Sequence, residues 1–321
     1  MSVVTVEGAY GQLLAEGYIR SEPKRGFFVS PLEIASPPAQ QAPSVPVAEE
    51  AAAPVPEYDF ATNAVDAVHF PFSTWAKLMR QVLTREDSGL LSAIEPQGVP
   101  ALRAAIVQYL HDFRGITANP DQVVVGAGSE YLIGILFQLL GREGGYAVED
   151  PGYLKVSRIL AHQGALVCPI PLDDQGLRVD ALRWSGARVV HVTPSHHYPL
   201  GTVMPVGRRR ELLSWAAEIP ERYIIEDDYD SEFRFVGRPI PTLFSVSENQ
   251  RVIYLNTFSK TIAPALRISY MILPQALLPI WQETMGFYSC AVPSFDPRGF
   301  TPASTWPWIG HPVSGLRHAT S

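Results

Sequence analysis

Between residues 58 and 295, short apolar runs rich in β-branched residues alternate with segments of helical periodicity. We expect strands at residues 123–125, 145–148, 166–168, 188–192, 223–225 and 252–255. We expect helices at residues 75–83, 100–113 and 129–140. Continuous apolar runs are typical of strands buried on both faces of a mostly parallel sheet. The pattern therefore predicts an α/β domain, in which ligands bind beyond the carboxyl ends of the strands.

A lysine follows the last of these predicted strands. The segment TFSKTIAPALR at 257–267 places Lys260 between hydroxyl residues, with Arg267 seven positions later. A lysine amine at such a place can form a Schiff base with an aldehyde cofactor. Thr257, Ser259 and Arg267 can hold that cofactor's phosphate. Taken alone, the segment is more typical of a surface lysine in a polar loop.

An acidic segment follows the predicted strand at residues 223–225. It reads EDDYD and contains Asp227 and Tyr229. A carboxylate at the end of a strand can keep the nitrogen of a pyridine ring protonated, and Tyr229 can hydrogen-bond an oxygen of that ring. The alternatives are a solvated acidic loop or a metal site. We predict no metal, because no histidine in the segment helps to bind one.

A glycine loop and a tyrosine complete the set. Gly128 and Ser129 lie between a predicted strand and a helix, where helix N–H groups are open to an anion. Tyr153 begins a loop after another strand, and its ring can stack on a flat heterocycle. Each feature alone is also typical of an ordinary turn. Their common order along the chain favours a pyridoxal 5′-phosphate (PLP) site.

These segments resemble the fold type I aminotransferases, the superfamily of aspartate aminotransferase. The resemblance covers residues 58–295 and implies a PLP-binding large domain with a mainly parallel sheet. Three segments are most similar to the MocR/GabR group: TPSHHYP at 193–199, EDDYDSEFR at 226–234 and TFSKT at 257–261. That group consists of bacterial GntR-type transcriptional regulators with an aminotransferase-like effector domain.

The resemblance implies a role for each candidate residue. Lys260 corresponds to the lysine that carries PLP, Asp227 to the partner of the pyridinium nitrogen and Tyr229 to the partner of the 3′ oxygen. Tyr153 corresponds to the stacking aromatic residue. The residues that correspond to the phosphate pocket are Gly128, Ser129, Thr257, Ser259 and Arg267. We also expect Lys260 to be buried beside Arg267, because both effects lower the pKa of an amine that must attack in its neutral form.

Residues 1–30 are expected to form a helix followed by a hairpin. Apolar residues recur at helical spacing up to Gly17, and the hairpin turn contains Lys24 and Arg25. The segment resembles the recognition helix and wing of a GntR winged helix-turn-helix, which implies DNA as a partner. Since two helices precede the recognition helix in that fold, we expect a partial domain with weakened DNA binding.

Two further segments differ in composition. Residues 31–57 are rich in proline and alanine and contain no lysine or arginine, which predicts an extended linker. Prolines recur through residues 296–321 and predict an irregular tail. Family members continue past this point into a small domain whose arginine clamps the substrate carboxylate, and we expect that domain to be missing here.

Two residues in the predicted large domain depart from the pattern of the family's enzymes. Ala93 stands where a tyrosine is expected that reaches the phosphate of the neighbouring subunit. Tyr198 stands where the enzymes have an asparagine near the ring. Both departures argue against full transaminase activity.

Composition limits the partners of the whole chain. The formal net charge is −7 at pH 7, so any contact with nucleic acid must be local. Two cysteines and the lack of a signal peptide favour the cytoplasm. The most apolar stretch, residues 131–140, is too short to span a bilayer.

Three functions remain open. A transcriptional regulator that senses an amine or amino acid through PLP is favoured by the N-terminal segment, the linker and the group-specific motifs. A PLP-dependent aminotransferase of class I/II is favoured by the cofactor residues, but it needs the clamp and the small domain. A truncated, inactive product is the third. The family typically forms homodimers, so we expect a homodimer.

Overall fold

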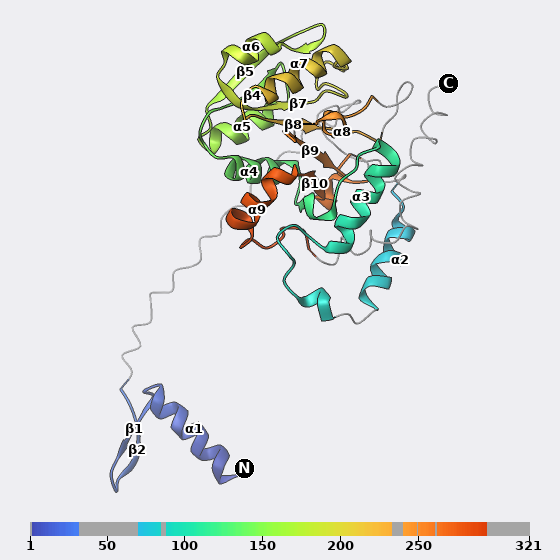
Figure 1. Cartoon of the computed structure of the whole chain (residues 1–321). Helices are drawn as coiled ribbons and strands as arrows, with labels where there is room; N and C mark the ends of the chain where they lie inside the picture. The colour runs from blue at the N-terminus through green and yellow to red at the C-terminus, as the bar shows by residue number, and fades with distance from the viewer. Residues whose placement is uncertain are drawn as a thin grey trace, which may run out of the picture. The chain divides into compact units, whose positions relative to one another are not determined.

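The chain divides into two compact units, residues 1–59 and 60–321 (Figure 1). The computed structural model describes residues 2–31, 70–84, 88–232, 240–248, 250–260 and 262–293. The expected tail, and all of the expected linker except residue 31, lie outside these described residues. The predicted boundaries of these two segments therefore stay predictions.

The first unit contains the expected helix and hairpin. Helix α1 spans Val3–Ala15. Strands β1 (Ile19–Glu22) and β2 (Gly26–Val29) pair antiparallel. The rings of Tyr10 and Phe27, whose centroids are 4.9 Å apart, join the helix to the hairpin. Among the described residues of this unit, α1 buries none of its side chains.

The second unit is built on an eight-stranded sheet in the order β3-β10-β9-β8-β7-β4-β5-β6. The strands are β3 (Val123–Gly126), β4 (Gly145–Asp150), β5 (Val167–Asp173), β6 (Gly176–Leu177), β7 (Ala187–Val192), β8 (Tyr223–Asp227), β9 (Val252–Thr257) and β10 (Ser269–Ile272). The series β5-β4-β7-β8-β9 is parallel throughout, which confirms the prediction from the apolar runs. In contrast, β10 is antiparallel to both β9 and β3, and β6 is antiparallel to β5.

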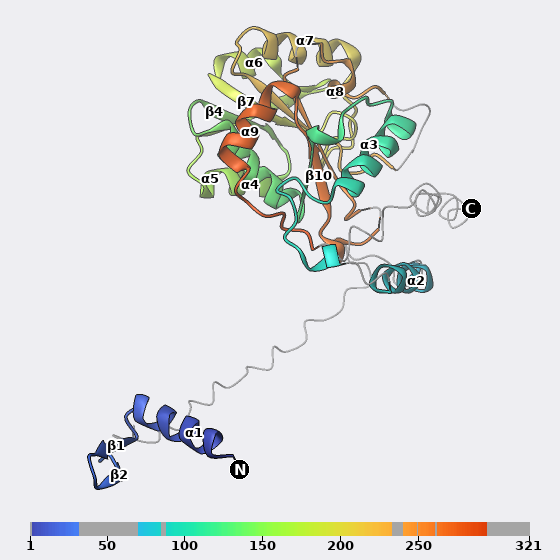
Figure 2. The same cartoon turned by 60° about the horizontal axis from the view of Figure 1, so that its bottom comes forward.

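Helices cover both faces of this sheet (Figure 2). One face packs against α4 (Ser129–Leu140), α5 (Leu154–His162) and α9 (Leu278–Met285). The other face packs against α3 (Pro100–Arg114), α6 (Val179–Trp184), α7 (Val206–Ala217) and α8 (Leu243–Val246). Helix α2 (Phe72–Leu83) precedes them in the chain. Alternate residues of one strand enter opposite cores: Val124 packs with α4, whereas Val123 and Val125 pack with α3.

Four predicted site segments meet at one edge of the sheet. Ser269 lies opposite both Gly126 and Thr257. Because β10 is antiparallel, its first residue lies at the carboxyl ends of β3 and β9. Asp227 ends β8 and pairs with Leu255, two residues before the end of β9. The loops that carry the candidate residues therefore start from the same edge, as the rule for parallel sheets predicts.

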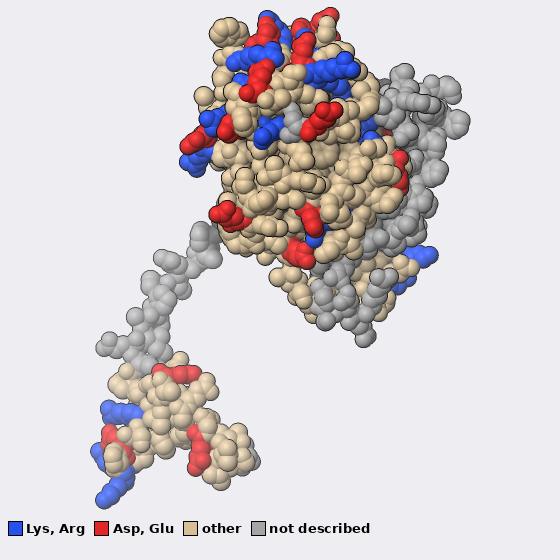
Figure 3. Space-filling model, in the orientation of Figure 1, with Lys and Arg blue, Asp and Glu red and all other residues tan. Residues whose placement is uncertain are grey.

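Charged side chains are unevenly spread over the second unit. On the face drawn in Figure 3, acidic and basic side chains intermix over α6 and α7, and few charged atoms lie over α4 and α9. Opposite charges at close range offset each other's field at longer range. Among the residues that the structure describes, none of the helices combines the length and the hydropathy that crossing a membrane requires.

Candidate cofactor site

The start of α4 combines a glycine, an arginine and an open helix end. Gly128 caps the helix with φ 98°, and Ser129 is its first residue. A side-chain carbon on Gly128 would collide with the guanidinium of Arg267. That guanidinium donates to the Ala127 carbonyl at 3.3 Å and lies 3.6 Å from the Glu130 carboxylate. Glycine therefore allows Arg267 to approach a helix N-terminus, where N–H groups favour an anion.

A group of hydroxyls lies at the end of β9. The Thr257 hydroxyl donates to the Ser259 hydroxyl at 3.0 Å and accepts from the Ser259 amide at 3.1 Å. It also accepts from the Ser269 hydroxyl at 2.8 Å. These bonds shape the turn that leads from β9 to Lys260. The structure thus brings Thr257 and Ser259 together as predicted and adds Ser269, which the sequence analysis missed.

Lys260 differs from expectation in its burial. The side chain is exposed, although we expected it to be buried beside Arg267. The reason is local: the buried strand ends at Thr257, Phe258 still packs in the core, and Ser259 is half-buried as the chain turns outward. The expectation of a buried Lys260 side chain is therefore wrong.

Asp227 is held by a histidine from the neighbouring strand. Its Oδ2 atom lies 3.2 Å from Nε2 of His191, and both side chains are buried. His191 lies opposite Ile225, two residues before Asp227, so the two side chains emerge on the same face. Sequence analysis missed His191. Strand alternation predicts that His191 and Asp227 lie on the same face of the sheet, but this identifies them as partners only when β7 and β8 are known to be neighbours.

The acids on either side of Asp227 have structural partners instead. The Glu226 carboxylate accepts two backbone N–H bonds at the start of α8, at 2.8 and 2.9 Å. Asp228 accepts a bond from Arg114 at 2.7 Å. Strand alternation thus leaves Asp227 as the member of this trio that faces His191. In the part of the chain that the structure describes, no group of three or more His, Cys, Asp or Glu residues is suited to hold a metal ion.

Aromatic rings from three segments gather near Asp227. The rings of Tyr153 and Tyr198 meet edge to face, with centroids 5.7 Å apart and an interplanar angle of 87°. The Tyr229 ring stacks on His196 at 6.2 Å. Burial, and secondarily the negative charge of Asp230, raise the pKa of Tyr229, so its phenol keeps its proton at neutral pH. Tyr198, singled out as a departure, therefore lies in direct contact with the predicted stacking residue.

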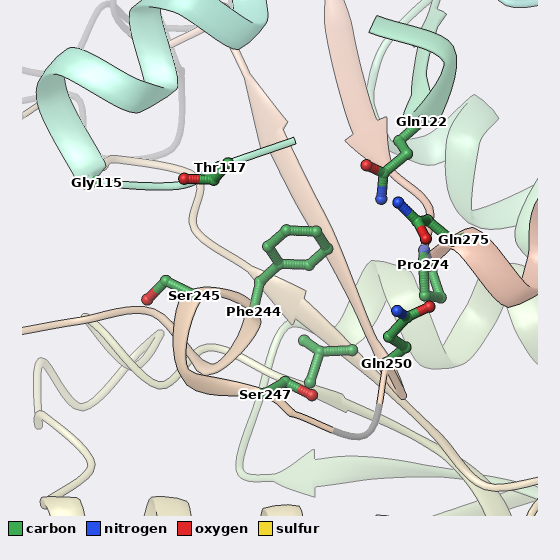
Figure 4. Close-up of a pocket in the computed structure, with 10 residues that line it drawn as sticks. Gly115, Thr117, Gln122, Phe244, Ser245, Ser247, Gln250, Pro274 and Gln275 are labelled. Carbon is green, nitrogen blue, oxygen red and sulfur yellow. The ribbon is translucent and has the colours of Figure 1, made fainter. Parts of the chain in front are cut away.

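A separate pocket of about 250 Å³ lies at the opposite edge of the sheet (Figure 4). Gln122 precedes β3, Val252 begins β9 and Pro274 follows β10, which marks the edge away from Asp227 and Thr257. Phe244 lies at its centre, with glutamine and serine side chains around it. None of the described residues that line it carries a charge. The pocket is thus distinct from the arrangement of Gly128 and Arg267 at the start of α4.

Comparison with known proteins identifies the family. Residues 57–295 match the family model for aminotransferase class I and II. The chain belongs to this family. Its large domain has the predicted fold type I architecture, with a mixed, mostly parallel sheet.

Proteins of similar sequence include MocR-type regulators, which confirms the predicted resemblance. The uncharacterized HTH-type transcriptional regulator YdeL of Bacillus subtilis is 40% identical over 292 residues, covering 91% of this chain and 63% of that protein. The probable rhizopine catabolism regulatory protein MocR of Rhizobium meliloti is 35% identical over 287 residues, covering 85% and 58% respectively. The chain thus spans about 60% of the length of these relatives.

Solved structures agree on the fold. A multiple substrate aminotransferase from Thermococcus profundus superposes with a TM-score of 0.68 at 26% identity, over 80% of this chain and 67% of that one. A kynurenine aminotransferase from Pyrococcus horikoshii superposes with a TM-score of 0.70 at 23% identity, over 80% and 66%. The second likeness concerns the fold alone.

Proposed function

We propose that this chain is the PLP-binding part of a transcriptional regulator that senses an amine or an amino acid. The observation that supports this most is the convergence of Asp227, Lys260 and Arg267 at one edge of the sheet. The regulatory role draws its support from the HTH-type regulators that the chain is similar to. A cytoplasmic location and a homodimeric state are parts of the same proposal.

The donor set fits PLP group by group. The start of α4, with Gly128, Ser129 and Arg267, would take the phosphate, and Thr257 and Ser259 would add hydroxyls. Asp227 would face the ring nitrogen, Tyr229 the 3′ oxygen and Tyr153 the ring face. Lys260 would bind the aldehyde carbon. When bound there, PLP supplies a ring that withdraws electrons from the amine that it carries.

The protein's own groups would set the charge of that ring. His191 fixes the orientation of the Asp227 carboxylate through the 3.2 Å contact. A carboxylate in this place keeps a proton on the ring nitrogen. The raised pKa of Tyr229 keeps its phenol protonated, so it would be able to donate a hydrogen bond to the 3′ oxygen. An incoming amine would compete with Lys260 for the aldehyde carbon, which accounts for the proposed class of effector.

DNA binding belongs in this proposal to the first unit. Helix α1 and the β1–β2 hairpin would be the recognition helix and wing of a partial winged helix-turn-helix. Two basic residues of the hairpin are paired with one acid: Arg25 lies 2.7 Å and Arg20 3.5 Å from the Glu22 carboxylate. Such pairing weakens attraction to phosphates, so we expect weak DNA binding by this chain alone.

An aminotransferase is the second candidate, supported by the same donor set and by the 26% identity with a multiple substrate aminotransferase. The position of Tyr198 argues against it. Transfer of an amino group from an amino acid to a keto acid would single out this function. If the chain binds PLP but shows neither amino-group transfer nor regulation, the result would favour an inactive product.

The test is an absorption spectrum of the purified protein with PLP, followed by borohydride reduction and peptide mapping. We expect a visible band, with the reduced cofactor on the peptide that contains Lys260, and its loss in Lys260→Ala. Lys155→Ala is the matched control, because Lys155 is an exposed lysine that is paired with Glu130 at the start of α4. A folded protein with no band, or with cofactor spread over several lysines, would contradict the proposal.

A further inference from the structure

A buried glutamate lies beside the candidate site without a role in the function proposed above. Glu149 is the last but one residue of β4, and 7% of its surface is exposed. Its Oε2 atom accepts a hydrogen bond from the Thr193 amide at 3.1 Å and another from the Thr193 hydroxyl at 2.8 Å. Nε2 of His197 lies 3.5 Å from the same oxygen.

These contacts join the two segments that carry the facing tyrosines. Glu149 stands four residues before Tyr153, and Thr193 stands five residues before Tyr198. The two segments leave neighbouring parallel strands, β4 and β7. The loop at 193–201 closes on itself through backbone bonds, including one of 2.7 Å from the Gly201 amide to the His197 carbonyl. Glu149 therefore contacts a loop whose backbone bonds link its own residues to one another.

We propose that Glu149 is a positioning residue of the candidate site, which ties the 193–201 loop to β4 and thereby sets the place of the Tyr198 ring against Tyr153. The positioning of the loop by Glu149 rests on these contacts alone. Any influence of Glu149 on PLP binding rests in addition on the proposed function.

The surroundings of Glu149 make this tie sensitive to pH. Burial, opposed by the bonds from Thr193, raises the pKa of Glu149 to about 7. The groups that face it are Thr193 and His197 from the loop, His191 from β7 and Asp227 from β8. Burial lowers the pKa of His197, so that ring is neutral near pH 7. Ionisation of Glu149 near pH 7 therefore adds a negative charge to the group of side chains that includes Asp227 and His191.

Glu226 provides a matched control. It is also a buried glutamate, its pKa is also raised to about 7 by burial, and it also accepts two hydrogen bonds. The N–H groups that donate to it, however, belong to the first amides of α8, and it reaches the loop at 193–201 only indirectly, through Arg209, which lies 3.9 Å away and donates to the Pro194 carbonyl. Glu226→Gln keeps an oxygen that can accept from these amides and leaves the bond from Arg209 to Pro194 in place, so it changes a buried carboxyl group without removing a direct contact of the loop.

The first experiment measures backbone hydrogen exchange over residues 193–201 in the full chain without PLP. Glu149→Ala removes the acceptor, and we expect exchange at Thr193 to rise about tenfold, because a buried donor loses its partner. Glu149→Gln keeps an amide oxygen as acceptor and should preserve most of the protection. Glu226→Gln should leave the loop unchanged. Unchanged exchange at Thr193 in Glu149→Ala would overturn the proposal.

The second experiment follows PLP. We expect Glu149→Ala to weaken PLP binding by about tenfold. We expect the cofactor band of the wild type to change with pH near 7. This change should be lost in Glu149→Gln and kept in Glu226→Gln. A band whose pH dependence is unaltered in Glu149→Gln would refute this part.

Two further outcomes separate the proposals. A wild-type protein that binds no PLP refutes the proposed function, while the exchange measurement still decides the role of Glu149. If Glu149→Ala does not fold, Glu149→Leu takes its place, since it keeps most of the side-chain bulk and removes both acceptor oxygens. Unchanged exchange at Thr193 in a folded Glu149→Leu would then overturn the tie.

Discussion

At the scale of single residues, Gly128 decides whether an arginine can reach the start of α4. Its φ of 98° is accessible to glycine at little cost, and the guanidinium of Arg267 occupies the space of a side chain. The same glycine opens the helix N-terminus to an anion. The lack of a side chain at Gly128 thus permits both parts of the proposed phosphate site, the Arg267 guanidinium and the open N–H groups of α4.

We expect Gly128→Ala to displace Arg267 and weaken PLP binding by about tenfold or more, because it combines backbone strain with a collision. Gly141→Ala is the control. Gly141 ends the same helix with φ 82°, and a side chain there meets no atom within 4 Å. Both variants should lose about 1–2 kcal/mol of unfolding free energy. Titration with PLP distinguishes them, and equal affinities would disprove the role of Gly128.

At the scale of elements, α7 anchors the loops behind the site through one buried arginine. Arg209 donates to the Met204, Pro241 and Pro194 carbonyls at 2.9, 3.0 and 2.7 Å. Its guanidinium also lies 3.9 Å from the carboxylate of Glu226. Three chain segments and the start of α8 therefore depend on a single side chain.

Arg209→Met should lower the free energy of unfolding by about 3–5 kcal/mol, because it leaves three buried carbonyls without their donor and a buried carboxylate without its nearby positive charge. Arg210→Met, an exposed neighbour on the same helix, should change it by less than about 0.5 kcal/mol. Denaturant unfolding of both variants measures the difference. A loss below 1 kcal/mol in Arg209→Met, as a rough threshold, would show that α7 is not an anchor.

At the scale of the whole molecule, two buried glutamates link stability to pH. Burial raises the pKa of Glu149 and of Glu226 from 4.5 to about 7. Between these values the folded chain holds protons that the unfolded chain releases. Folding is therefore favoured at the lower end of this window, and this contribution is lost as the pH rises through the folded pKa.

We expect the free energy of unfolding to fall from about pH 5 to about pH 8, by on the order of 3 kcal/mol per glutamate. Denaturant unfolding across this range measures the slope. The double variant Glu149→Gln, Glu226→Gln should flatten it, because neither amide titrates. A stability that rises with pH, or a slope that survives in the double variant, would contradict this account.

The local sequence was sufficient for much of the fold, whereas the candidate site residues that it singled out stay predictions. The apolar runs predicted the parallel strands, and the helix at 129–140 has the predicted bounds. Strands β6 and β10 were missed, because two and four residues are too few for a periodic signal. Helices α5 to α9 were not located individually. The direction of each strand within the sheet could not be predicted either, since a short apolar run does not reveal that β10 is antiparallel.

The amino-acid sequence by itself determined the residue types at the strand ends and the order in which Gly128, Asp227, Lys260 and Arg267 follow one another. Tertiary structure alone decided that His191 holds Asp227, that Glu149 ties the tyrosine loop and that Lys260 is exposed. The physical reason is that periodicity records which face of an element is buried. Contacts between distant segments depend on which strands become neighbours and on how each loop leaves the sheet.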